Sequence, residues 1–248
     1  MNKLDVSKIR VVAMDLDGTL TQHKQPLTPE NYEALMQLKT RYRLVMAGAG
    51  QVMRVYNQLG QFPVDAIIGN YGLQYAIRNS ETGELETQRD LVFPCERESV
   101  DARVTMLRKK YGFTEFRGEN VEFHPSGIVT FPILGTKAIQ EDKLAFDPDR
   151  SKRRAIYQDV CEVFSDYTVF VGGSSSFDMA PFPYNKAYAL DLYCKEQGLS
   201  HENVVYIGDD YGPGGNDESV YLSDFPYLTI DDYRDFPKVI EPLLTSKL

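Results

Sequence analysis

The sequence predicts an α/β fold: a Rossmann-like core built on a parallel sheet and interrupted by an inserted α+β domain. Short apolar runs typical of buried strands alternate with helical segments towards both ends of the chain. Between them, this alternation gives way to a mixture of helices and strands. We therefore expect a core domain formed by residues 1–82 and 184–248, and an inserted domain formed by residues 83–183.

The first elements of the core follow from apolar runs and from helix-start signals. Thr28, Pro29 and Glu30 have the character of an N-cap, a first helical residue and a first-turn acid. Gly60 is placed to end the second helix. The expected elements are a strand at Val11–Met14, a helix from Pro29, a strand at Leu44–Ala47, a helix at Gln51–Leu59 and a strand at Asp65–Ile68.

The middle of the chain has a different pattern. Polar residues at Asn79–Asp90 indicate a hairpin or loop. The inserted domain is then expected to contain helices at Ser99–Lys110 and Asp149–Phe164, and strands at Asn120–His124 and Tyr167–Val171. The core pattern returns with a helix at Ala187–Gln197 and strands at Val204–Ile207 and Tyr227–Ile230.

Two carboxylates, Asp15 and Asp17, directly follow the first predicted strand. Residues i and i+2 of an extended backbone point the same way. Isolated buried charges are costly, so such a pair is better suited to binding a hard cation such as Mg²⁺ than to a core. One carboxylate can also attack as a nucleophile while the other transfers protons. Gly18 would form the turn and Thr19 would offer a hydroxyl and amides; the alternative is an ordinary acidic turn.

A second acidic loop follows the strand at Val204–Ile207. The run Gly208–Asp217 contains the oxygen-bearing side chains of Asp209, Asp210, Asn216 and Asp217. In a parallel sheet the carboxyl ends of strands share one edge, so this loop and the first motif should meet there and hold Mg²⁺. A solvated acidic turn is the competing interpretation. Lys186, just before a predicted helix, is the candidate cation for offsetting phosphate charge.

Composition narrows the class of protein. The net charge of −9 and the pI near 4.9 disfavour a nucleic-acid binder. Three separated cysteines and three scattered histidines favour neither a disulfide framework nor a zinc site. No segment is apolar enough to span a membrane, and Met1–Val6 lacks a signal-peptide core.

We expect a cytoplasmic protein with a small phosphorylated substrate and with no nucleic-acid or membrane partner. The sequence is also compatible with a homodimer.

The run Asp15-Leu16-Asp17-Gly18-Thr19 resembles the first motif of the haloacid dehalogenase-like phosphohydrolases. The resemblance implies that Asp15 attacks phosphorus and becomes an aspartyl-phosphate. Asp17 would protonate the leaving oxygen and then activate water. The resemblance also implies that the Asp15 carboxylate, the Asp17 backbone carbonyl and Asp209 bind Mg²⁺. Lys186 would bridge the phosphate and the nucleophile, with Thr19 and Gly48 also binding phosphate.

The later motifs resemble one branch of that superfamily, the eukaryotic-type phosphomannomutases, which carry an inserted cap of the C2B type. This resemblance rests on Gly172–Asp178, Lys186 and the Pro213–Asp217 run. It implies that Ser176 and Asp178 contact a sugar, that Arg117 and Lys24 match phosphate-binding arginines, and that Gly48 is shared with the branch. Two further arginines of the branch fall at about Ile128 and Gly135, where this chain has no cation.

These departures decide the expected activity. Each charge-assisted phosphate contact contributes about 1.5–3 kcal/mol, so two missing arginines would weaken retention of a bisphosphate intermediate. We therefore expect a Mg²⁺-dependent phosphatase acting on a small metabolite, most simply a sugar phosphate. One alternative is a phosphomannomutase-type mutase that uses other basic residues such as Lys137 or Lys143. Another is a non-catalytic sugar-phosphate-binding module.

Overall fold

The computed structural model describes residues 4–245, which form two compact units. The core comprises the chain up to Asp90, then Lys186–Gly212, and the chain from Asp217. The inserted unit comprises Leu91–Asn185 and Pro213–Asn216. Residues 1–3, part of the segment considered for a signal peptide, lie outside the described residues. None of the helices in residues 4–245 is long and apolar enough to cross a membrane.

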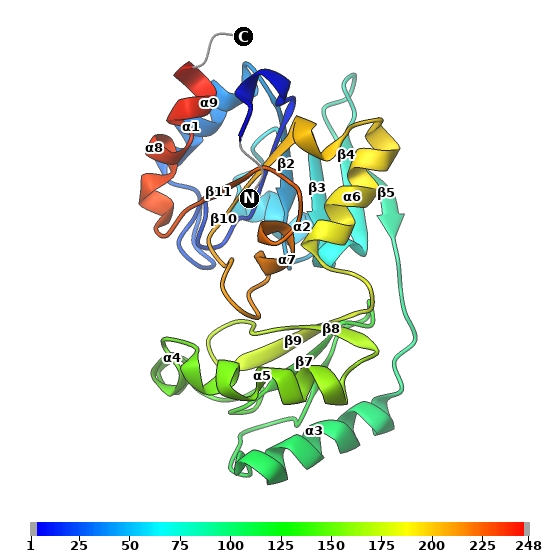
Figure 1. The fold of residues 1–248 in the computed structure, drawn as a ribbon. Coiled ribbons are helices and arrows are strands. Elements are labelled where there is room, and N and C mark those ends of the chain that lie inside the picture. The colour runs from blue at the N-terminus through cyan, green and yellow to red at the C-terminus, as the bar shows by residue number, and fades with distance from the viewer. Residues whose placement is uncertain (1–3, 246–248) are drawn as a thin grey trace. The chain divides into compact units, whose positions relative to one another are not determined.

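A seven-stranded sheet with the order β11-β10-β1-β2-β3-β4-β5 forms the centre of the core (Figure 1). The first five strands in this order are parallel, and β4 and β5 are antiparallel additions at one edge. The strands are β1 (Val11–Met14), β2 (Arg43–Ala47), β3 (Ala66–Gly69), β4 (Gln74–Arg78), β5 (Leu85–Asp90), β10 (Val204–Gly208) and β11 (Tyr227–Thr229). The predicted α/β class with a predominantly parallel core sheet is confirmed.

The edge strand β5 differs from the sequence analysis. It pairs with β4 at the edge of the core sheet, whereas residues from 83 onward had been assigned to the inserted domain. Five of the six residues of β5 are polar, and the strand has no buried face; the exception is Leu85 at its start. Backbone pairing at a sheet edge holds such a strand. A hairpin or loop was expected at Asn79–Asp90, but the side-chain pattern did not show that its second strand extends the core sheet.

Helices cover both faces of the core sheet because side chains alternate along each strand. Val12 and Met14 of β1 pack in one apolar cluster with α1, α2 and α8, whereas Val11 and Ala13 pack in another with α6 and α7. Thr28 caps α1 as predicted, its hydroxyl accepting from the Asn31 amide. The helices are α1 (Pro29–Lys39), α2 (Val52–Gln58), α6 (Lys186–Gln197), α7 (Glu218–Tyr221), α8 (Phe236–Val239) and α9 (Glu241–Thr245).

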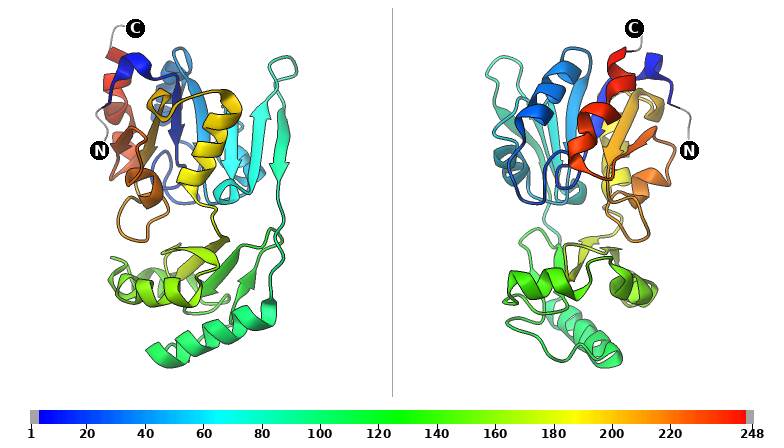
Figure 2. Two further views of the ribbon diagram at one scale, coloured as in Figure 1. Left: turned by 45° about the vertical axis from the view of Figure 1, so that its right-hand side comes forward. Right: turned by 90° about the vertical axis from the view of Figure 1, so that its left-hand side faces the viewer.

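The inserted unit is an α+β layer with its own core. Its four-stranded antiparallel sheet has the order β6-β7-β9-β8, and helices α3 and α5 pack their apolar residues on one face (Figure 2). The elements are α3 (Arg97–Tyr111), β6 (Glu122–Phe123), β7 (Val129–Pro132), α4 (Gln140–Phe146), α5 (Ser151–Val163), β8 (Tyr167–Phe170) and β9 (Ser176–Pro181).

The two central strands of this sheet, β7 and β9, were not among the expected elements. Each carries a proline at its end and a glycine shortly before its start, which are signals of turns. Phe131 and Phe177 nevertheless stack at a centroid distance of 6.0 Å within the core of the unit. Packing against α3 and α5 therefore outweighs the turn signals.

A fully buried ion pair lies beneath the loop between β8 and β9. Arg153 donates through Nε to Asp147 at 2.7 Å, and both side chains are at most 1% exposed. The guanidinium also donates to the carbonyls of Gly172, Gly173 and Ser176 at 2.6, 3.1 and 3.1 Å. One side chain thus satisfies several backbone acceptors, fixing the loop that leads to Asp178.

We predict that Asp147→Asn lowers the free energy of unfolding at neutral pH by about 3–5 kcal/mol, because Arg153 would become an uncompensated buried charge. Burial raises the pKa of Asp147, but hydrogen bonds from Arg153 and from two backbone amides outweigh it and lower the pKa. The stabilisation is therefore present above the unfolded-state value near 3.8 and is lost as the pH falls further.

Urea unfolding of both proteins at neutral pH and near pH 3 measures this difference, which should shrink at the lower pH. Asp149→Asn is a matched control, because Asp149 is exposed and bonds only nearby groups of the helix start. Equal stabilities of wild type and Asp147→Asn at neutral pH would contradict the prediction.

Candidate active site

Asp15 and Lys186 form the centre of the site. The Asp15 amide donates to the Ile207 carbonyl at 3.0 Å, which continues the β1–β10 pairing beyond the strand end. Lys186 is the first residue of α6, and its Nζ lies 3.1 Å from Asp15 Oδ1. Lys186 is 1% exposed and Asp15 is 6% exposed, so the two charges meet in a desolvated place.

Asp217 is the second partner of Lys186. Its Oδ1 lies 2.7 Å from Lys186 Nζ, and its Oδ2 accepts from the Asp210 amide at 3.1 Å. Asp217 is fully buried. Lys186 therefore bridges the carboxylates of two loops that are far apart in the sequence and follow the neighbouring strands β1 and β10.

Asp209 is the third carboxylate near Lys186 and is held by the first motif. Thr19 donates to Asp209 Oδ1 at 2.8 Å. Gly18 has φ +94°, and a Cβ on it would lie 2.3 Å from Asp209 Oδ2. The glycine is thus required twice, for its backbone conformation and for the approach of Asp209.

Electrostatics distinguishes these groups. Burial, together with the carboxylates of Asp217 and Asp209, raises the pKa of Asp15 to about 8 against the opposing effect of Lys186. Burial and the Asp217 carboxylate raise the pKa of Asp209 to about 6. Burial alone would lower the pKa of Lys186, but its two carboxylate partners raise it above its ordinary value. A further positive charge would hold both Asp15 and Asp209 ionised near neutral pH.

The donor set fits a hard divalent cation. Asp15, Asp209 and Asp217 each place a carboxylate oxygen so that all three lie within 4.8 Å of one another. All three ligand groups offer oxygen, the donor that Mg²⁺ prefers. Three carboxylates face a single ammonium group, so the cluster has the excess negative charge that a cation would neutralise. Asp217 already accepts bonds at both oxygens, which leaves Asp15 and Asp209 as the better ligands.

Asp17 is in a different environment from Asp15. Its Oδ1 accepts from Gln58 Nε2 and from the Lys24 amide, each at 2.7 Å, and Arg54 donates to Oδ2 at 3.1 Å. Burial would raise the pKa of Asp17, but these donors outweigh it and lower the pKa. Two carboxylates two residues apart thus have opposite pKa shifts. Nucleophilic attack requires Asp15 to be ionised, which a bound cation would favour, and proton donation requires the pKa of Asp17 to rise, which a neighbouring phosphate anion would cause.

Arg54 and Gln58 were not predicted as site residues. They lie one turn apart on α2, the helix after the Gly48-Ala49-Gly50 loop, and Arg54 donates to Gln58 at 2.9 Å. The sequence signal that could have identified them is their i, i+4 spacing, which puts both side chains on one face of a helix that follows a predicted strand-end loop. Lys24, predicted to contact substrate phosphate, contributes its backbone amide to Asp17 in this structure.

The structure brings several predicted residues together and leaves others apart from them. The core cluster contains Asp15, Thr19, Lys186, Asp209, Asp210 and Asp217. Asp17 follows the same strand as Asp15 but bonds Lys24, Arg54 and Gln58 instead. Gly48 lies beside Asp15, since a Cβ on it would be 3.8 Å from Asp15 Oδ1. The Gly48 amide, however, donates to the Ile68 carbonyl at 2.9 Å. The Thr19 hydroxyl is likewise engaged, by Asp209.

Four predicted residues belong to the inserted unit: Arg117, Asn216, Ser176 and Asp178. Asp178 accepts from Thr130 at 2.9 Å, and burial raises its pKa. Ser176 donates to the Gly172 carbonyl at 3.1 Å, and Arg117 makes an exposed ion pair with Asp142 at 3.6 Å. Their roles towards a substrate remain predictions.

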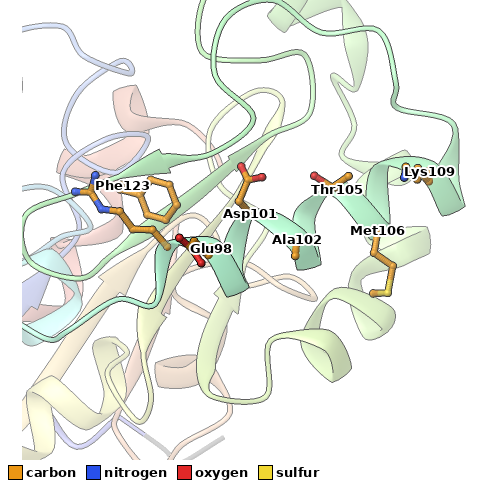
Figure 3. Close-up of a pocket in the computed structure, with 8 residues that line it drawn as sticks. Glu98, Asp101, Ala102, Thr105, Met106, Lys109 and Phe123 are labelled. Carbon is orange, nitrogen blue, oxygen red and sulfur yellow. The ribbon is translucent and has the colours of Figure 1, made fainter.

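The inserted unit also has a pocket along α3. Glu98, Asp101, Thr105 and Lys109 extend from that helix, with Phe123 beside them (Figure 3). None of the predicted site residues lines this pocket. It combines acids, a base and apolar carbons without the converging carboxylates of the core cluster, and we do not assign the chemistry to it.

The chain is similar to known proteins in sequence and in fold. Residues 12–217 match the family described as haloacid dehalogenase-like hydrolase. A probable phosphomannomutase of Caenorhabditis elegans is 24% identical, covering 94% of this chain and 95% of that protein. The IMP-bound IMP-nucleotidase mutant of Plasmodium falciparum has a TM-score of 0.66 at 13% identity, covering 96% of this chain and 69% of that one. A subclass IIB sugar phosphatase has a TM-score of 0.61 at 15% identity, covering 94% and 98%.

We predict that Gly18→Ala abolishes stabilisation of the protein by Mg²⁺. The substitution costs about 1–3 kcal/mol in backbone strain and also displaces Asp209, whose carboxylate occupies the position of the new methyl group. The measurement is the rise in melting temperature on adding Mg²⁺, which reports binding to the folded state.

Gly60→Ala is the matched control. Gly60 also has a positive φ, +64°, but nothing lies within 4 Å of its Cβ position. This variant should lose comparable stability while keeping the response to Mg²⁺. A full Mg²⁺ response in Gly18→Ala would show that Asp209 does not depend on this close approach.

Proposed function

Because the chain belongs to the haloacid dehalogenase-like hydrolase family, we propose that it transfers the phosphoryl group of a small sugar phosphate by way of an aspartyl-phosphate on Asp15. The observation that carries this proposal is the buried Asp15–Lys186–Asp217 bridge with Asp209 beside it. A nucleophilic carboxylate next to a fixed cation and an oxygen-ligand set is what phosphoryl transfer requires.

In the first step, an Asp15 oxygen attacks phosphorus and the bond from phosphorus to the sugar oxygen breaks. Asp17, whose pKa the neighbouring phosphate anion would raise, gives its proton to that leaving oxygen. In the second step, an acceptor hydroxyl attacks the aspartyl-phosphate while Asp17 takes up the acceptor's proton, and Asp15 is regenerated. Arg54 and Gln58 hold the Asp17 carboxylate in one orientation throughout.

The other residues stabilise the transferred group. Lys186 faces the Asp15 oxygen that would carry phosphorus, so its charge can offset that of the phosphoryl oxygens. Mg²⁺ held by the carboxylates of Asp15 and Asp209 and the backbone carbonyl of Asp17 would supply further electrostatic stabilisation. Because the Gly48 amide and the Thr19 hydroxyl are engaged, phosphate contacts in these segments fall to neighbouring backbone amides.

For the acceptor, the relatives favour a sugar hydroxyl over water. The Caenorhabditis elegans relative is named as a probable phosphomannomutase, and its match extends over nearly the whole chain. We therefore propose a phosphosugar mutase as the first candidate, in place of the phosphatase that the sequence analysis preferred. Arg117 and Lys137 support a site for a second phosphate, because the Lys137 amide donates to the Arg117 carbonyl at 2.9 Å and places two cations on adjacent segments.

A hydrolase is the second candidate, and two positions favour it. Ile128 is buried and apolar, and Gly135 has no room for a side chain, since a Cβ would lie 2.1 Å from the Arg117 carbonyl oxygen. Neither position can hold a distal phosphate. With fewer cations in the inserted unit, the sugar bisphosphate intermediate would dissociate more easily. Water could then reach the aspartyl-phosphate on Asp15.

We predict that Asp15→Asn abolishes turnover without destabilising the fold. The neutral amide keeps the shape but cannot attack phosphorus. Because the pKa of Asp15 is raised to about 8, the folded state is penalised as the pH rises from about 4 through 8, and the variant escapes this penalty. Melting temperature against pH and phosphate release from p-nitrophenyl phosphate measure both effects.

The control is Asp90→Asn on β5, which removes an exposed carboxylate of the same sheet. It should keep full activity. Turnover by a well-folded Asp15→Asn protein would rule out Asp15 as the nucleophile, and an inactive wild type that still binds sugar phosphates would favour the non-catalytic module.

We predict that, with mannose 1-phosphate or glucose 1-phosphate and a hexose 1,6-bisphosphate activator, the 6-phosphate isomer forms faster than free phosphate is released. The reason is that cations of the inserted unit retain the bisphosphate while it reverses its orientation. Coupled assays of both products, with the activator omitted as control, give the two rates. Faster release of phosphate than of isomer would instead establish the hydrolase.

A further inference from the structure

Tyr206 is a buried polar residue next to the site that the proposed chemistry does not use. It lies in β10, two residues before Gly208, and is fully buried. Its hydroxyl donates to Asp217 Oδ1 at 2.6 Å, the same oxygen that lies 2.7 Å from Lys186 Nζ. A longer contact of 3.4 Å reaches the Ala47 carbonyl.

The neighbouring strand offers a natural comparison. Tyr227 of β11 is the register partner of Tyr206, and the ring centroids are 5.5 Å apart. The Tyr227 hydroxyl is buried and has no hydrogen-bond partner among residues 4–245. Gly208 makes room for both side chains, since a Cβ there would lie 2.5 Å from Asp217 Oδ2 and 2.6 Å from the Tyr227 hydroxyl. Two tyrosines thus flank Asp217, and only Tyr206 bonds to it.

We propose that Tyr206 is a positioning residue for phosphoryl transfer, whose hydroxyl holds Asp217 so that Lys186 stays shared between Asp217 and Asp15. The inference rests on the proposed function. Asp217 accepts from three groups among the described residues: Tyr206, Lys186 and the Asp210 amide. Without the phenol, Oδ1 would depend on Lys186 alone. The ammonium group would then be drawn towards Asp217 and away from the phosphoryl group on Asp15.

A phenol suits this position because it is a neutral donor. Hydrogen bonds to charged groups are stronger than those between neutral groups, so Tyr206 stabilises the buried Asp217 anion effectively. A second lysine or arginine at the same place would add a charge that repels Mg²⁺. Phenylalanine would fill the same volume but leave Oδ1 under-satisfied. The hydroxyl oxygen is therefore the atom to test.

The experiment compares Tyr206→Phe with Tyr227→Phe. Each removes one buried hydroxyl from adjacent positions of paired strands, but only the first removes a hydrogen bond to Asp217. Binding of inorganic phosphate in the presence of Mg²⁺, measured by calorimetry, needs no turnover. We expect Tyr206→Phe to weaken it roughly 10- to 100-fold, the range for a hydrogen bond to a charged group. Tyr227→Phe should bind as wild type.

Turnover separates positioning from a merely structural role. Because Tyr206 acts on the phosphoryl group, its loss should lower kcat/KM by the same factor for a sugar phosphate and for p-nitrophenyl phosphate. In a double-variant cycle, Tyr206→Phe should cause little further loss of phosphate binding when combined with Asp217→Asn, because the two act as one unit. A variant that is only less stable would show neither the equal loss of kcat/KM on both substrates nor the non-additivity with Asp217→Asn.

Wild-type phosphate binding in Tyr206→Phe, or full additivity with Asp217→Asn, would overturn the inference while leaving the proposed function intact. Conversely, a protein that turns over no phosphoester would reject the proposed function, and with it the role of Tyr206 in phosphoryl transfer, even where phosphate binding depends on Tyr206. If Tyr206→Phe alone is too unstable to measure, the comparison within the Asp217→Asn background decides: a further loss of phosphate binding there overturns the inference, and no further loss upholds it.

Discussion

The buried ammonium group of Lys186 is the constraint on which the site depends. Removing a lysine from water is costly unless anions replace its hydration, and here Asp15 and Asp217 do so at 3.1 and 2.7 Å. Those anions are in turn tolerable only because the lysine lies between them. The parallel pairing of β1 with β10 brings the two acidic loops together, and the start of α6 supplies the cation.

The two carboxylates of the first motif show how a short stretch of chain acquires two chemistries. Asp15 is surrounded by other acids in a desolvated place, which raises its pKa, whereas Asp17 turns towards donors on α2 and has a lowered pKa. Environment separates them, although both follow the same strand. Environments that push the pKa values of paired acids apart are a mark of acid–base chemistry.

Much of the core could be predicted because its signals are local. Thr28 caps a helix through its own side chain, and buried strands such as β1 are uninterrupted apolar runs. The meeting of Asp15 with Asp209 followed from the geometry of parallel sheets. Arg54, Gln58 and Tyr206 escaped prediction because their roles depend on tertiary neighbours: a polar residue on a helix or a tyrosine in a strand is ordinary in isolation. β7 and β9 escaped because long-range packing overrides their prolines and glycines.

The tyrosines near the acidic loop have a spectroscopic consequence. Tyr206, Tyr211, Tyr221 and Tyr227 pack with ring centroids 5.2 to 6.3 Å apart. The chain contains no tryptophan, so no indole signal masks them. Fixed aromatic packing of this kind generates near-ultraviolet circular dichroism. The four rings belong to a chain with sixteen tyrosines, so the part of the signal that is lost in their phenylalanine variants is the part that reports on the loop beside Asp217.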